Sequence, residues 1–215
     1  MDYIIDHISK SKTKRPGVAI SPGFITIHNT ANPKSTARNE RNWLSNPNNK
    51  ASASWHICID EKEAIEAIPL NEKAYHTGTA AGNAQSIGIE LCESGNQAKV
   101  WKNAIALVAN LLYERAWTVK NLKTHKNWSG KNCPRLILPV WAQFVGEVDS
   151  LLYELKNPAK TPANAPQAET AVSDFAKDAI EWAKAQNVSD GSRLKENCTR
   201  EEVLTMIYRA MKEEK

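Results

Sequence analysis

Residues 24–28, Phe-Ile-Thr-Ile-His, form the stretch that decides the expected fold. Their β-branched and aromatic side chains favour a strand, and His28 stands where that strand would end. Further strands are expected over three segments of similar character: 54–60, 64–69 and 86–92. Apolar residues at helical spacing predict helices over three other segments: 35–46, 101–117 and 138–155. Strands that alternate with helices indicate an α/β domain with a mixed central β-sheet flanked by helices.

The strand expected over 54–60 shows the clearest alternation. Trp55, Ile57 and Ile59 alternate with His56, Cys58 and Asp60. This period of two predicts a strand that is buried on one face only.

His28, His125 and Cys133 are the candidate metal ligands. The last two belong to a polar segment, 125–134, which is expected to be a loop. Two imidazoles and one thiolate suit Zn²⁺, and three protein ligands leave a fourth position for water, as a hydrolytic zinc requires.

The segments around these residues form a recognisable series of motifs. They are Ile27-His28-Asn29-Thr30, Ser54-Trp55-His56, Tyr75-His76-Thr77-Gly78, Asn83-Ala84-Gln85-Ser86-Ile87-Gly88-Ile89-Glu90 and the segment 125–134. In this order, over roughly residues 20–150, the chain resembles the zinc-dependent N-acetylmuramoyl-L-alanine amidases of phage endolysins and bacterial autolysins. Animal peptidoglycan recognition proteins are related to this family. The resemblance implies an amidase/peptidoglycan recognition protein-like fold.

The resemblance also implies roles for individual residues. It makes His28, His125 and Cys133 the zinc ligands, and Glu90 the general base beside them. Lys131 matches a lysine that faces the scissile carbonyl in phage relatives, where an ammonium would stabilise the oxyanion.

Three more residues are expected at the substrate side of the site. His76 matches a position that lines the substrate groove, and Asn83 is expected to shape the same rim. Trp55 stands where many relatives have a catalytic tyrosine, and we expect it to pack the floor of the site. His56 belongs either to the core or to the surroundings of the metal, and His7 is expected to be a surface residue without a partner.

Three functions from different classes follow from these residues. The first is a peptidoglycan hydrolase, an endolysin that cuts the amide between N-acetylmuramic acid and L-alanine of the stem peptide. The second is a non-catalytic peptidoglycan-binding protein of the same fold, which the complete ligand set, Glu90 and Lys131 argue against. The third is a zinc peptidase that cuts within the stem peptide, which the residues do not exclude.

Composition bounds the setting. The 215 residues, 41% of them hydrophobic, suit a soluble protein with one medium and one small domain. No apolar run of the ~20 residues that span a bilayer is present, and no nucleic-acid motif stands out, so neither partner is expected. The first residues lack the pattern of a secretory signal, which predicts retention in the host cytoplasm until lysis and action on the cell wall afterwards.

Charge and cysteines add two further expectations. Residues 1–160 carry 20 Lys or Arg against 14 Asp or Glu, and residues 161–215 carry 8 against 10. The basic half could favour approach to an anionic wall, or could be ordinary surface charge. Cys58 and Cys92 lie in strand-like runs and are expected to be buried free thiols.

The chain is expected to divide near residue 156. Residues 1–156 would form the catalytic domain, and residues 157–171, rich in proline and alanine, a linker. Residues 172–215 predict two helices, the first with Phe175, Ile180 and Trp182 on its apolar face. The second would be capped by Thr199 with Glu202, with four apolar residues inside: Val203, Leu204, Ile207 and Tyr208.

This helical segment resembles one S-layer homology module. The matching pieces are Ala179-Ile180-Glu181-Trp182-Ala183, Val188-Ser189-Asp190-Gly191 and Cys198-Thr199-Arg200-Glu201-Glu202. The resemblance implies binding to secondary cell-wall polysaccharide. Such modules usually occur in three copies and this chain has one, so a helical hairpin that packs on the catalytic domain or mediates a dimer stays an alternative.

Overall fold

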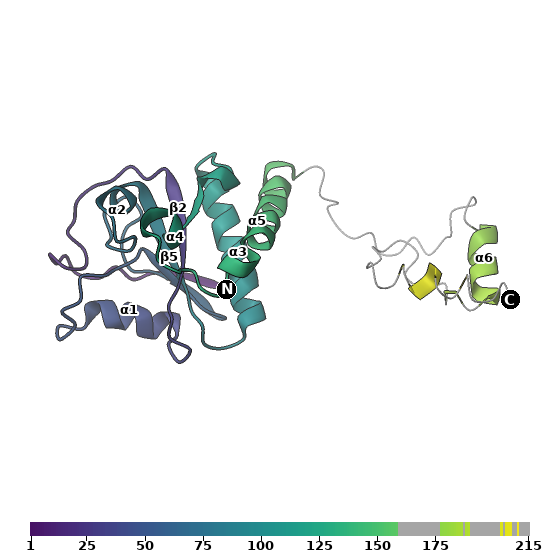
Figure 1. Ribbon diagram of the computed structural model, residues 1–215, viewed down its shortest axis with the longest axis horizontal. Helices are drawn as coiled ribbons and strands as arrows, with labels where there is room; N and C mark the ends of the chain where they lie inside the picture. The colour runs from purple at the N-terminus through teal and green to yellow at the C-terminus, as the bar shows by residue number, and fades with distance from the viewer. Residues whose placement is uncertain (159–176, 187, 190–202, 204, 208–209, 211–215) are drawn as a thin grey trace. The chain divides into compact units, whose positions relative to one another are not determined.

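The computed structural model describes residues 1–158, 177–186, 188–189, 203, 205–207 and 210. The chain divides into two compact units, Met1–Lys160 and Thr161–Lys215. The first unit holds the sheet and every residue of the expected active site (Figure 1).

A six-stranded mixed sheet forms the centre of the first unit. Its strands are β1 (Asp2–Ile5), β2 (Phe24–Asn29), β3 (Ile57–Ile59), β4 (Glu63–Glu66), β5 (Ser86–Leu91) and β6 (Leu122–Thr124). Their order is β1-β4-β3-β5-β2-β6; β3 and β4 pair antiparallel, and the other neighbours pair parallel. The expected mixed sheet is confirmed.

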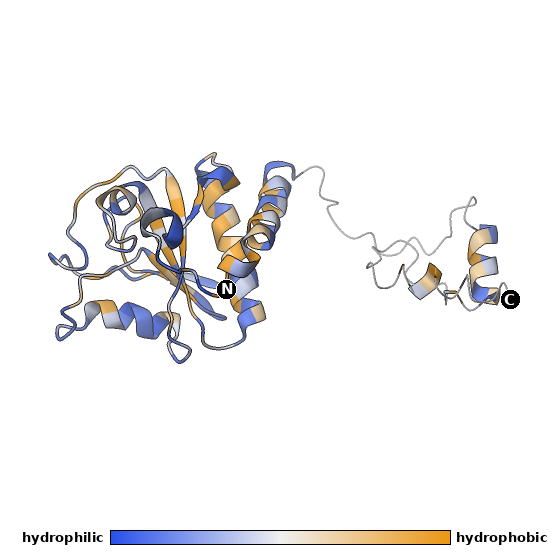
Figure 2. Cartoon of the chain, in the orientation of Figure 1, coloured by the Kyte–Doolittle hydropathy of each residue, from blue (hydrophilic) through white to orange (hydrophobic). Residues whose placement is uncertain are grey.

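Helices cover both faces of this sheet. They are α1 (Ala37–Ser45), α2 (Ala80–Gln85), α3 (Gln97–Glu114), α4 (His125–Ser129) and α5 (Trp141–Lys156), with 3₁₀ turns at Val119–Asn121 and Leu138–Val140. The long helices α3 and α5 pack on one face, and α1 lies on the other (Figure 1). Figure 2 shows the corresponding pattern, with apolar residues along the strands and α3 and a largely hydrophilic α1.

Alternation along β2 separates the core from the site. Ile25 and Ile27 are fully buried and belong to the large apolar cluster with α3 and α5. Successive side chains of a strand point to opposite faces, so Thr26 and His28 point to the α1 side. In β5, Ile87 and Ile89 share the core face in the same way, which leaves Glu90 on the side of His28.

The strand expected over 54–60 differs from the prediction in two respects. It is only three residues long, Ile57–Ile59, and both of its faces are buried. Cys58 has no exposed surface because it packs into the apolar cluster beneath α1. The prediction of one buried face was therefore wrong, since a second helical layer covers this part of the sheet. Cys58 and Cys92 are confirmed as buried free thiols.

Several element boundaries also shifted. Helix α3 begins at Gln97, where the Asn96 side chain accepts a hydrogen bond from the Lys99 amide, four residues before the expected start. It ends before Trp117 because Ala116 adopts a positive φ of 53°. The short edge strands β1 and β6 were not predicted, since three or four residues give little periodicity.

In the second unit, helix α6 spans Lys177–Ala185, within the first helix expected there. Trp182, Val203 and Ile207 are 53%, 40% and 49% exposed. Val203 and Ile207 were expected as apolar residues inside the second helix, and both side chains are exposed. The capping pair Thr199 and Glu202, and nearly all of the expected linker, lie outside the described residues. None of the described helices is long and apolar enough to cross a membrane.

Candidate metal centre

Strand pairing brings the two histidines of the site together. In the parallel pair of β2 and β6, Ile27 lies opposite Thr124. The residues that follow, His28 and His125, therefore meet at the same end of the sheet. His125 is the first residue of α4, which Thr124 caps by accepting a hydrogen bond from the Asn127 amide. The expectation that His125 lies in a loop was wrong, because a five-residue helix begins with it.

Cys133 reaches the same point from the segment after α4. The side chain of Asn29, at the end of β2, accepts a hydrogen bond from the Leu136 amide at 3.1 Å. Arg135 forms a two-pronged ion pair with the buried carboxylate of Glu93. These two anchors fix the segment that carries Cys133 against the end of the sheet.

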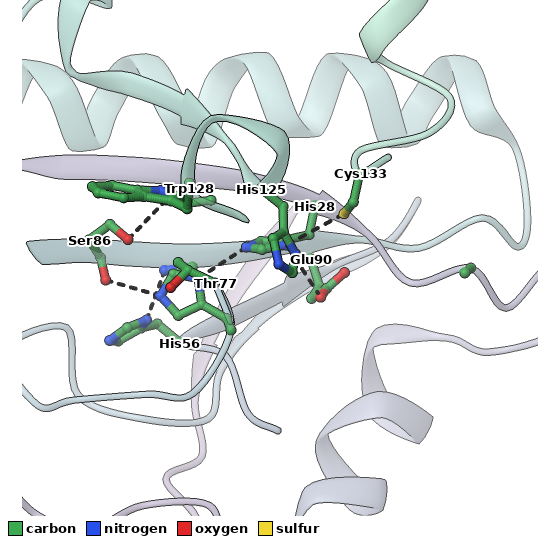
Figure 3. A network of polar contacts seen from close by, with 12 residues as sticks. His28, His56, Thr77, Ser86, Glu90, His125, Trp128 and Cys133 are labelled. Carbon is green, nitrogen blue, oxygen red and sulfur yellow. Dashed lines mark hydrogen bonds and ion pairs between the residues drawn. The ribbon is translucent and has the colours of Figure 1, made fainter. Parts of the chain in front are cut away.

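The three candidate ligands have the spacing of a metal site. His28 Nδ1 lies 3.1 Å from His125 Nδ1 and 3.5 Å from Cys133 Sγ. A tetrahedral zinc with ordinary bond lengths would separate such atoms by about 3.3 and 3.6 Å. All three side chains are buried, and within the described residues they are the one group of histidine, cysteine and carboxylate side chains close enough to share an ion (Figure 3).

Burial shifts the acid–base properties of these ligands. It is the main reason that the pKa of His28 lies well below its usual value, and it lowers the pKa of His125 as well. Burial raises the pKa of the Cys133 thiol to about 11, opposed by a hydrogen bond from the Asn29 backbone. The histidines thus present neutral nitrogens, the form that binds a metal.

Glu90 stands beside the cluster. It lies opposite His28 in the pairing of β2 with β5, and its Oε1 is 4.0 Å from His28 Nδ1. Its Oε2 is buried and has no hydrogen-bond partner among the described residues. Burial raises the pKa of Glu90 to about 8, Glu40 and Glu93 add to this effect, and Lys131 opposes it. A buried carboxylate oxygen without a partner fits a site that takes a cation or a proton at this point.

Lys131 is exposed and lies two residues before the candidate ligand Cys133, whose amide donates to the Lys131 carbonyl. Its positive charge helps to lower the pKa of His28, His125 and Glu90. It is therefore the cation that acts on both the candidate ligands and the carboxylate. The structure brings four of the expected residues together, His28, His125, Cys133 and Glu90, and the charge of Lys131 acts on all four.

His76 lies next to the candidate ligand His28. Its side chain is 7% exposed, and its Nδ1 lies 3.0 Å from His28 Nε2, behind the candidate metal ligand. Asn83 lies in helix α2, which follows the loop of His76. Its Oδ1 accepts hydrogen bonds from the amides of His76 and Thr77, both at 2.9 Å.

Trp55 and His56 both pack into the interior. Trp55 stacks on Trp43 of α1, with ring centroids 5.6 Å apart, in the apolar cluster between α1 and the sheet. His56 is fully buried and bonds only backbone among its described hydrogen bonds: Nδ1 accepts from the Gly88 amide, and Nε2 lies 2.8 Å from the Glu72 carbonyl.

His7 was expected to lack a partner, and that expectation was wrong. Its Nε2 lies 2.7 Å from Glu66 Oε1. The fold supplies this partner because β1 pairs with β4, the strand that ends with Glu66, and His7 follows β1.

Sequence reasoning also missed the groups that support the histidine ligands. The Ser86 carbonyl lies 3.2 Å from His76 Nε2, and the Thr77 backbone hydrogen-bonds the His125 ring. Thr77 lies within one of the motifs quoted above. A contact made by its backbone does not depend on the residue type, so the sequence does not reveal it. The dashed lines in Figure 3 mark polar contacts between the residues drawn there, among them Ser86, Thr77 and His125.

A buried His-His-Cys cluster beside a carboxylate, one oxygen of which has no partner among the described residues, has the composition of a metallohydrolase site. The sequence signature of the N-acetylmuramoyl-L-alanine amidases matches residues 19–136, and the chain belongs to this family.

Known relatives agree with this assignment. The N-acetylmuramoyl-L-alanine amidase XlyA of Bacillus subtilis (strain 168) is 39% identical over 165 residues, which are 73% of this chain and 55% of XlyA. The solved catalytic domain of XlyA superposes with a TM-score of 0.66, covering 69% of this chain and 99% of that domain at 39% identity. A mutant endolysin from Bacillus subtilis, 38% identical, gives a TM-score of 0.65 and covers 68% of this chain and 98% of that chain. The match spans 55–60% of the length of three of these curated relatives, XlyA, CwlH and CwlA of Bacillus subtilis (strain 168).

Proposed function

We propose that this protein is a zinc-dependent peptidoglycan hydrolase of the endolysin type. It would cleave the amide bond between N-acetylmuramic acid and L-alanine of the stem peptide. The observation that carries the proposal is the cluster of His28, His125 and Cys133 beside the unpartnered oxygen of Glu90. The names of the relatives, N-acetylmuramoyl-L-alanine amidases, support the choice of this bond as the one that is cleaved.

The residues of the cluster fit Zn²⁺. Two neutral imidazoles and a thiolate are ligands that zinc prefers, and their separations agree with tetrahedral coordination. A bound zinc would supply a Lewis acid and a water of lowered pKa.

The remaining steps belong to the side chains around the cluster. Glu90 would act as general base, because its Oε2 has no hydrogen-bond partner among the described residues and its Oε1 is 4.0 Å from His28 Nδ1. Lys131 would face the scissile carbonyl and stabilise the negative charge that develops on its oxygen. The same Glu90 proton would then pass to the leaving amine of L-alanine.

Mass spectrometry of digested peptidoglycan tests this function. We expect free stem peptides that begin at L-alanine, together with glycan strands that keep their lactyl groups. Fragments cut within the stem peptide would identify a zinc peptidase instead. Peptidoglycan that is bound but unchanged would identify a non-catalytic binding protein.

The first prediction concerns the metal. Purified protein is expected to contain one zinc per chain, and Cys133→Ala should lose most of it because two imidazoles alone hold zinc weakly. Elemental analysis after dialysis measures both. Cys92→Ala is the matched control, since Cys92 is an equally buried thiol outside the cluster. An active preparation free of metal would contradict the proposal.

The setting of this activity is proposed from the likeness to endolysins. The protein would stay in the host cytoplasm until lysis and then act on the cell wall. Residues 172–215 would bind secondary cell-wall polysaccharide, as one S-layer homology module does, or form a dimer contact. The exposed Trp182 gives this segment an aromatic surface, the kind of side chain that stacks on sugars.

The second prediction separates these two units. Residues 1–156 contain every proposed chemical residue and lie within the first compact unit. The truncated protein is expected to hydrolyse soluble muropeptides within about twofold of the full chain, because few contacts should cross a domain boundary. It should bind whole cells more weakly, because a tethered binding module raises local concentration. Sedimentation of cells with each protein measures binding; equal binding by both would make the tail a stabilising or dimer-forming segment.

A further inference from the structure

The second ring nitrogen of the ligand His28 has a defined partner. His28 Nδ1 points to the candidate metal position, and Nε2 lies 3.0 Å from His76 Nδ1. The far side of the His76 ring ends on a backbone group, since His76 Nε2 lies 3.2 Å from the carbonyl oxygen of Ser86. A line of contacts thus runs from the metal position through two imidazoles to the backbone of β5.

The direction of every hydrogen bond along this line follows from its last member. A carbonyl oxygen only accepts, so His76 Nε2 must carry the proton. The His76 ring is buried, with no carboxylate among its described contacts, which favours the neutral form with one N–H. Its Nδ1 is then a lone pair, so His28 Nε2 must be the donor. His28 Nδ1 is consequently free of a proton and faces the metal position.

The sequence leaves room for this arrangement at one residue. Gly88 lies under the His76 ring, and a Cβ at Gly88 would come within 2.6 Å of the ring atoms Cγ and Nδ1. The ring is rigid and buried, so it would have to shift. A glycine here is what allows His76 to lie flat against β5 and reach both of its partners.

The backbone of His76 is held from the other side. Its amide and that of Thr77 donate to the same oxygen, Asn83 Oδ1, and Thr77 Oγ1 donates to this oxygen as well, at 2.9 Å. The Thr77 backbone then supports the second ligand, His125. Two consecutive residues of one loop therefore each support one histidine ligand.

We propose that His76 is a positioning residue that fixes His28 as the Nε2–H tautomer and thereby presents Nδ1 to the metal. Asn83 and Gly88 hold and accommodate His76 in this role. The inference rests on the proposed zinc site and assigns His76 to support of the metal ligand in place of contact with substrate.

Nuclear magnetic resonance of the ¹⁵N-labelled, metal-free protein tests the tautomers directly. The chain has five histidines, so long-range ¹H–¹⁵N correlations of the rings can be assigned one by one. We expect Nε2–H signals for both His28 and His76, and the same pattern after zinc is added. An Nδ1–H form of His28 in the metal-free wild type would overturn the proposal. This measurement needs no variant and no substrate.

Metal affinity provides the second readout. His76→Gln is expected to weaken zinc binding by about 10–100-fold, the usual effect of removing a partner of a ligating histidine. The absorption bands of the Co²⁺-substituted protein should shift as well, because the imidazole of His28 would reorient. Gly88→Ala should weaken binding in the same direction while keeping every imidazole.

His56→Gln is the matched control. His56 is a fully buried histidine whose ring lies edge-on to His76, with ring centroids 5.6 Å apart, and bonds the backbone of Gly88 and Glu72. It makes no described hydrogen bond to His28 or His76, so it serves as a control for packing around His76. This variant should lose stability yet keep zinc affinity within about threefold. Equal losses of affinity in His56→Gln and His76→Gln would show a general packing effect and overturn the specific role. If the wild type bound no zinc, the proposed function would fail instead. The tautomer of His28 in the metal-free protein would still show whether His76 fixes it.

Discussion

Glu90→Ala is expected to lower kcat/KM on peptidoglycan by about 10²–10³-fold while the protein keeps its fold and its zinc. The carboxylate is 4.0 Å from a nitrogen of the ligand His28 and is not itself part of the ligand cluster. Its loss therefore removes a proton acceptor without removing a ligand. Glu90→Gln should behave in the same way, because the amide keeps the size of the side chain but cannot accept the proton.

Lys131→Ala is expected to cause a loss of similar size for a different reason. The ammonium would stabilise charge that appears only in the transition state, so kcat should fall more than KM changes. Lys126→Ala is the matched control, since Lys126 is an exposed lysine of the neighbouring helix α4. Turnover above about half of wild type in both Glu90→Ala and Lys131→Ala would refute the roles assigned to them.

The second large effect concerns stability and pH. Burial lowers the pKa of His56 from 6.5 to about 4, opposed by a hydrogen bond to the Glu72 carbonyl. Between these values the unfolded chain binds a proton at His56 and the folded chain does not, so the free energy of unfolding falls as the pH falls. A difference of this size corresponds to about 3 kcal/mol over the whole window.

Comparison with His56→Gln isolates this contribution. The raised pKa of Glu90 acts in the opposite sense, because its folded form takes up a proton first and gains stability on acidification. The pH dependence of the wild type alone is therefore a mixture. At about pH 7 the variant should be less stable than the wild type, and this gap should shrink by about 3 kcal/mol towards pH 4. Urea denaturation of both metal-free proteins measures the gap. A gap that stays constant with pH would show that folding does not lower the pKa of His56.

Strand character and motif order could be predicted from the sequence because they depend on local residue pattern. The apolar run before His28 and the Ser86–Glu90 motif predicted two neighbouring strands, β2 and β5. The family motifs predicted the members of the candidate metal cluster. The layer under α1 could not be predicted in this way. The apolar residues that α1 buries are few, so its contact with Cys58 and Trp55 depends on how distant strands pair.

The contact between His76 and His28 was not predicted, for a related reason. A histidine in a motif is consistent with contact to substrate or with support of a ligand, and the two differ only in which way the ring points. Here the direction is set by the missing side chain of Gly88 and by the carbonyl of Ser86. Both effects come from the backbone of these two residues, so the residue types in a single sequence do not reveal them.

Alternate residues of β2 belong to the apolar core and to the candidate site. Ile25 and Ile27 anchor the apolar core, and Thr26 and His28 between them serve the polar network and the metal centre. A slip of this strand by one residue would turn His28 into the core and the isoleucines toward the site. A chain with a misaligned β2 would thus lose the core contacts of its isoleucines and would also lose His28 from the candidate metal cluster. The register of β2 therefore decides both the packing of the apolar core and the geometry of the candidate metal centre.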